Sequence, residues 1–96
     1  MIKRNANELY VTGRITNHNA VDYYREGLAE ILNNAQYPLV VNLSQLEHGS
    51  TLALAIFVQW LRQTPQTNGL VFKAVPEKMM KIIQACHLEH DLKLLK

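Results

Sequence analysis

The spacing of apolar residues along this chain changes several times between a period of two and a period of about 3.6. Short runs that alternate or are wholly apolar, as in strands, occupy residues 8–15, 39–41, 70–72 and 92–95. Segments with helical spacing follow Asn19, Ser50 and Pro76. Because strands that alternate with helices require right-handed crossovers between parallel neighbours, the pattern predicts an α/β fold with a mixed, mostly parallel sheet.

The length and composition of the chain indicate one compact unit. Its 96 residues, of which 48% are hydrophobic, contain no repeats or low-complexity segments and are enough for one modest core. Pro38 opens the wholly apolar run Leu39–Val41, which favours a central strand covered on both faces. We expect residues 1–96 to form a single domain, a small sandwich with a mostly parallel sheet of about four strands and three or more helices.

The first and third helices each show one apolar stripe that predicts the face they bury. In the first helix, which begins after Asn19 and ends in Asn33-Asn34, the stripe consists of Val21, Tyr24, Leu28 and either Ile31 or Leu32. In the third helix, which starts with Pro76, the stripe consists of Met79, Ile82, Ile83 and Cys86. Breaks between elements are predicted at Gly13, Thr64-Pro65 and Asn68-Gly69.

The second helix carries more apolar surface than one buried face requires. Its first stripe suits the sheet and consists of Leu54, Phe57, Val58 and Leu61. A second stripe lies roughly opposite and consists of Leu52, Ile56 and Trp60, with Ala53, Gln59 and Gln63 at its margins. Either another part of the domain covers this stripe or a partner does. We expect a docking surface with Trp60 as its anchor, because tryptophan is typical of interface hot spots.

Charge and hydropathy argue against two classes of partner. Ten Lys and Arg against eight Asp and Glu give a net charge of +2. The basic residues are scattered rather than gathered in a stripe with aromatic neighbours, so we expect no nucleic-acid binding. No apolar run approaches the roughly 20 residues that cross a bilayer, and the N-terminal segment lacks the pattern of a secretory signal. We expect a cytoplasmic protein that does not insert into membranes.

No motif in the sequence indicates catalysis or a cofactor. A Gly-rich phosphate loop, a paired-carboxylate motif and a nucleophile elbow are all absent from the sequence, so we expect no enzymatic activity. Cys86, His87 and His90 are spaced like metal ligands, but a structural zinc site needs four ligands. We therefore predict no metal, and interpret Cys86 as a buried thiol beside helix-end histidines. His48 has no nucleophile at a recognisable spacing, and His18 lies in a loop.

Ser50 and Thr51 lie directly before the second helix, where a hydroxyl group can serve either of two functions. It accepts a hydrogen bond from an otherwise unpaired backbone N–H and so caps the helix. It is also a position for phosphorylation, where a phosphate would favour the helix terminus but would be costly in a desolvated interface. We favour capping, and the two roles do not exclude each other.

Residues 40–61 resemble the signature of STAS domains, a family in which a strand ending Asp-Leu-Ser leads to Asp-Ser-Ser-Gly-Leu at a helix start. Here Asn42-Leu43-Ser44 and His48-Gly49-Ser50-Thr51-Leu52 stand at those places. Ser50 matches the second serine, which is phosphorylated in the anti-sigma factor antagonists of the family, whereas His48, Gly49 and Thr51 depart from the pattern. Residues 70–94 are similar to the family's third strand, third helix and closing segment.

The resemblance implies a binding module, with two alternatives for its partner. One is a non-catalytic cytoplasmic subunit that binds and regulates or stabilises the ATPase of a phospholipid ABC transporter, and through it the membrane permease. Such transporters maintain outer-membrane lipid asymmetry in Gram-negative bacteria. The other is an anti-sigma factor antagonist controlled by phosphorylation at Ser50. The departures around Ser50 and the second apolar stripe favour the transporter subunit. We expect its partner to contact His48, Gly49, Ser50, Thr51, Leu52, Ile56, Gln59, Trp60 and Gln63.

Overall fold

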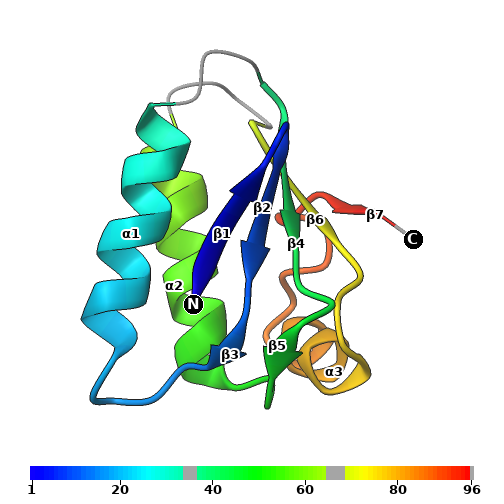
Figure 1. The fold of residues 1–96 in the computed structure, drawn as a ribbon. Helices are drawn as coiled ribbons and strands as arrows, with labels where there is room; N and C mark the ends of the chain where they lie inside the picture. The colour runs from blue at the N-terminus through cyan, green and yellow to red at the C-terminus, as the bar shows by residue number, and fades with distance from the viewer. Residues whose placement is uncertain (34–36, 65–68, 96) are drawn as a thin grey trace.

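The computed structural model describes residues 1–33, 37–64 and 69–95 (Figure 1). The strands in these segments are β1 (Ile2–Asn5), β2 (Glu8–Val11), β3 (Gly13–Arg14), β4 (Leu39–Asn42), β5 (Leu46–Glu47), β6 (Leu70–Lys73) and β7 (Leu94–Leu95). The helices are α1 (Ala20–Leu32), α2 (Thr51–Gln63) and α3 (Glu77–Ala85). The predicted order of strands and helices is therefore confirmed, while Asn34, Pro65 and Asn68 lie outside the described residues.

The main sheet is mixed and mostly parallel, as the sequence predicts. Within the described residues it has five strands in the order β1-β2-β4-β6-β7, and only the β1–β2 pair is antiparallel. The strand β1 is additional to the predicted ones, because three of its four residues are exposed and the segment lacks an apolar signal. Strand β4 lies at the centre, in the position predicted for Leu39–Val41.

A change of direction at Gly13 separates β2 from the short β3, which pairs in parallel with β5 in a second, two-stranded sheet. Gly13 has a φ of 83°, in the left-handed region that favours glycine. The hydroxyl of the buried Tyr23 donates a hydrogen bond to the Thr12 carbonyl at 2.5 Å and fixes this corner against α1. Burial raises the pKa of Tyr23, and the nearby carboxylates of Glu47 and Glu26 add to the effect.

Helices α1 and α2 lie side by side on one face of the main sheet (Figure 1). The side chains on this face are at most 1% exposed, and they are Leu9, Val11, Leu39, Val41, Leu70 and Phe72. On the other face Tyr10, Val40 and Val71 are only half-buried. The prediction that Leu39–Val41 is covered on both faces is therefore wrong, although parallel strands usually are.

The less buried face of the sheet carries a small polar network. Asn42, which is 7% exposed, donates a hydrogen bond from Nδ2 to Glu8 Oε1 at 3.2 Å and accepts one from the Ser44 N–H at 2.9 Å. Lys73 Nζ lies 3.4 Å from the same Glu8 oxygen. The Asn42 hydrogen bond, aided by Lys73, lowers the pKa of Glu8. The network thus satisfies a polar group buried at the end of the central strand.

Helix α1 buries a face that is shifted from the predicted one, with Tyr24 and Leu28 only partly buried at its margin. Its buried residues are Tyr23, Gly27 and Ile31, whereas Val21 and Leu32 are 57% and 52% exposed. The predicted stripe is therefore wrong at Val21, whereas Ile31, one of the two alternatives for its last position, is buried. The physical reason is that Gly27, which adds nothing to an apolar pattern, lies at the point of closest approach to α2. Asn19 does occupy the N-cap position, as predicted, but without a side-chain hydrogen bond to the helix.

Helix α3 begins at Glu77, one residue after Pro76, and buries Met79 and Ile83 as predicted. Cys86 is exposed, so the prediction of a buried thiol is wrong. The helix ends in a Schellman motif, in which His87 N–H donates to Gln84 O and Leu88 N–H donates to Ile83 O, both at 3.0 Å. His87 adopts the left-handed conformation that this motif requires, with a φ of 57°. The backbone course after residue 85 thus turns Cys86 away from the core.

None of the described helices is long and apolar enough to cross a bilayer.

Candidate partner-binding site

The turn before α2 is shaped by Ser50, which caps the helix as predicted. Its backbone is extended, with a φ of −147° and a ψ of 163°, and its Oγ accepts a hydrogen bond from the Ala53 N–H at 3.1 Å. One of the unpaired amides at the helix start is thereby satisfied. Thr51 follows as the first helical residue and is exposed, so its side chain is available at the surface.

Gly49 anchors this turn against α3. It is buried, and a methyl group added there would lie 2.9 Å from Met79 Sδ and closer still to Met79 Cγ. A side chain at this position would displace Met79, which is consistent with glycine where the STAS pattern has a hydroxyl residue. His48 precedes it with a φ of 55° and is exposed. The predicted contact residue Gly49 therefore supports the turn from inside, while His48 lies at the surface.

Trp60 joins α2 to α1 and is 0% exposed. Its indole N–H donates to the Tyr24 carbonyl at 3.0 Å, and its six-membered ring occupies the space left by the missing side chain of Gly27. Phe57 packs against the indole with ring centroids 5.4 Å apart. The prediction that Trp60 is an exposed docking anchor is therefore wrong, because α1 covers the second apolar stripe of α2.

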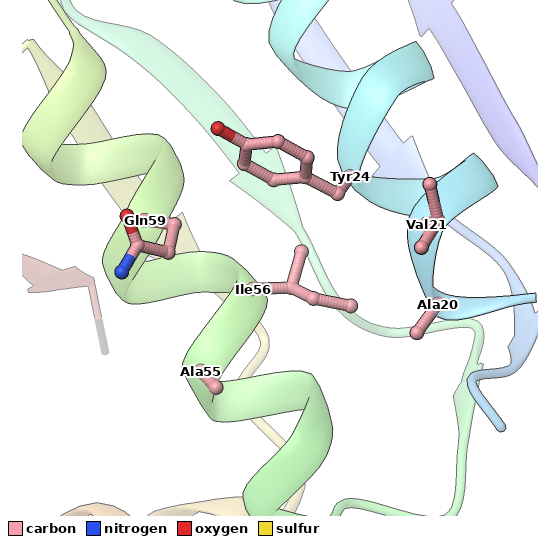
Figure 2. Close-up of a pocket in the computed structure, with 6 residues that line it drawn as sticks. All are labelled: Ala20, Val21, Tyr24, Ala55, Ile56 and Gln59. Atoms are coloured by element: carbon pink, nitrogen blue, oxygen red, sulfur yellow. The ribbon is translucent and has the colours of Figure 1, made fainter. Parts of the chain in front are cut away.

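Ile56, from the same stripe, is only 6% exposed, but it forms the floor of a groove between the two helices. Figure 2 shows side chains of α1 and α2 facing each other across this groove. Its volume is about 290 Å³, and its lining residues are Ala20, Val21, Tyr24, Ala55, Ile56 and Gln59. The Tyr24 hydroxyl accepts a hydrogen bond from Gln63 Nε2 at 2.8 Å. The groove is thus mostly apolar, with polar groups at one end.

The residues predicted to contact a partner fall into three groups. Those exposed at the surface are His48, Thr51, Gln59 and Gln63. Ser50 and Leu52 are half-buried, whereas Gly49, Ile56 and Trp60 are buried. The groove also contains Ala20, Val21, Tyr24 and Ala55, which the sequence reasoning missed. An apolar residue such as Val21 could have indicated this groove, but its spacing in the sequence fits a buried stripe equally well.

The described residues contain no group of three or more Cys, His, Asp or Glu that could hold a metal ion. Cys86, His87 and His90 are all exposed. The backbone of His87 belongs to the Schellman motif, which gives this residue a structural role at the end of α3.

The mostly parallel sheet, with α1 and α2 on one face and a Ser50-capped turn before α2, is the arrangement that the resemblance to STAS domains implies. The family model of the MlaB STAS domain matches residues 1–96. This chain therefore belongs to the MlaB family of STAS domains. The comparison with curated proteins gives no match.

Solved structures agree with this assignment. A chain of the Acinetobacter MlaFEDB complex in the ATP-bound Vtrans2 conformation is 59% identical, with a TM-score of 0.92 and coverage of 99% of both chains. The Vtrans1 conformation of that complex gives 58% identity, a TM-score of 0.90, and coverage of 99% of this chain and 100% of the other. An anti-sigma factor antagonist from Mycobacterium paratuberculosis is 17% identical, with a TM-score of 0.77 and coverage of 98% and 81%, and shows the shared fold alone.

Proposed function

We propose that this chain is a non-catalytic STAS subunit that binds and regulates or stabilises the MlaF-like ATPase of a phospholipid ABC transporter. The observation that carries the proposal is the 59% identity, over 99% of both chains, to a chain of the MlaFEDB complex. The match covers 99% of this chain, so the matched region includes the capped turn and α2. ATP hydrolysis then belongs to the partner, and the transporter maintains lipid asymmetry of the outer membrane.

The contact surface in this proposal comprises the capped turn and the exposed side of α2. His48, Thr51, Gln59 and Gln63 present side chains there, and Ser50 and Leu52 border them. The Ser50 hydroxyl is already engaged by the Ala53 N–H, and this bond holds the turn in one conformation without any modification. Binding that needs no phosphate fits a permanent subunit. Phosphorylation of Ser50 or Thr51 stays a prediction.

The proposal places the protein in the cytoplasm, held at the inner membrane only through the ATPase and the permease beyond it. Cell fractionation tests this directly. The tagged chain should sediment with membranes from cells that contain the ATPase, and should remain in the supernatant when the ATPase gene is deleted.

Affinity capture from detergent-solubilised membranes tests the identity of the partner. The tagged chain should recover the ATPase together with the membrane subunits, and Gln59→Glu should lower that recovery at least tenfold. Gln84→Glu, on the exposed side of α3, is the matched control and should recover the complex like the unaltered chain. Recovery of a small soluble kinase in place of the ATPase would refute the proposal.

A further inference from the structure

Helix α1 presents an apolar row to solvent beside the groove. Val21 and Leu32 are 57% and 52% exposed, and Leu28 between them is half-buried. These positions are spaced i, i+7 and i+11, so they lie along one side of the helix. Val21 also forms part of the groove wall (Figure 2). Groove and row together make one continuous apolar strip over α1 and α2, of the kind that marks an interaction surface.

Two basic residues lie beside this strip. Arg25 lies one turn from both Val21 and Leu28, and Arg62 lies on the same side of α2 as Ala55 and Gln59. Both arginines are exposed, and neither forms an ion pair within the described segments.

The acidic residues of α1 lie along a different side of the helix. Asp22, Glu26 and Glu30 are spaced at i, i+4 and i+8 and therefore form one row. Glu30 lies 3.5 Å from Arg4 of β1, which places this row on the side of α1 that faces the sheet edge. The outward face of α1 and α2 thus has Arg25 and Arg62 beside the apolar strip, while Asp22 lies one turn from Arg25, and Asp91 lines a separate hollow together with Arg62.

We propose that this outward face binds an acidic amphipathic helix of the partner ATPase, a deepening that rests on the proposed function. A groove between two packed helices accepts the side-chain ridge of a third helix, whose apolar residues enter the groove and cover the Val21–Leu32 row. Carboxylates on the flanks of that helix lie against Arg25 and Arg62. Complementary charges of this kind speed association and make the affinity depend on salt.

Charge reversal with a matched control tests the electrostatic half of the proposal. The dissociation constant is measured between the purified full chain and the purified cognate ATPase at low and at high salt. Arg25→Glu and Arg62→Glu should each weaken binding about tenfold at low salt and less at high salt. Lys78→Glu, on the exposed side of α3, changes the net charge equally and should stay within about twofold. Equal effects of all three variants would overturn the proposal.

An alanine pair tests the apolar half. Ala55→Gln puts a longer neutral side chain into the mouth of the groove and should weaken binding about tenfold, because the partner side chain is excluded. Ala85→Gln, on an exposed position of α3 away from the groove, should bind like the unaltered chain. Thermal melts of all variants confirm that each is folded. If the unaltered chain fails to bind the ATPase, the proposed function itself is refuted. If it binds but Ala55→Gln matches Ala85→Gln, only the helix proposal is refuted.

Discussion

Gly27→Ala is the substitution with the most informative expected effect. The added methyl group would lie 2.5 Å from Trp60 Cε2 and closer to Cζ2, well inside van der Waals contact. The indole has no room to retreat, because it is 0% exposed and its N–H is bonded to Tyr24 O. Overpacking costs about 1–3 kcal/mol, and losing the hydrogen bond costs about 1 kcal/mol. The higher helix propensity of alanine than of glycine stabilises the folded state by about 1 kcal/mol.

The expected net loss in the free energy of unfolding is about 2–3 kcal/mol, with the overpacking cost at its upper end. For a domain of this size it corresponds to a fall in melting temperature of about 10–20 °C. Urea denaturation followed by circular dichroism measures the loss directly. The same substitution in a Trp60→Leu background removes the overlap and should be neutral or stabilising by up to about 1 kcal/mol. An equal loss in both backgrounds, or a rise in stability in the native one, would refute this account.

Three further predictions concern local features. Ser50→Ala should lower the free energy of unfolding by about 1 kcal/mol, whereas Ser50→Asp should keep the cap, as urea denaturation of both variants can show. His87→Gly should raise stability by about 0.5–1 kcal/mol, because His87 has a φ of 57° at the end of α3, and a lower melting temperature would contradict this. The pKa of Glu8, measured by NMR titration, should lie below the ordinary 4.5 and rise toward it in Asn42→Ala. Since folding lowers this pKa, its stabilisation is present above pH 4.5 and is lost as the pH falls through the lowered value.

The order of elements and the capped turn could be predicted from sequence because both depend on local signals. Apolar runs mark β4 and β6, and a hydroxyl residue before an apolar helix marks Ser50 as a cap. The strand β1 escaped detection because its edge position leaves three of four side chains in solvent. Its backbone pairing with β2, which no apolar pattern reports, is what makes it a strand.

The predicted site was wrong where it depended on how α1 and α2 pack against each other. The apolar stripe through Ile56 and Trp60 is real, but periodicity cannot say whether a partner or α1 lies against it. That choice is made by Gly27, since only a residue without a side chain lets the indole lie flush against α1. Conversely, the spacing of Val21 in the sequence predicts a core residue, but its side chain is 57% exposed in the structure. Which residues of the site are exposed could therefore be learned only from the packing of α1 against α2 in the structure.

The joint between Trp60, Tyr24 and Gly27 has a consequence for affinity. It fixes α1 and α2 relative to each other, so the face they share is ordered before any partner arrives. Association then sacrifices little conformational entropy on this side of the interface. A substitution that loosens this contact would leave the surface residues unchanged. The variant would nevertheless bind more weakly, because each binding event would first have to order the two helices relative to each other.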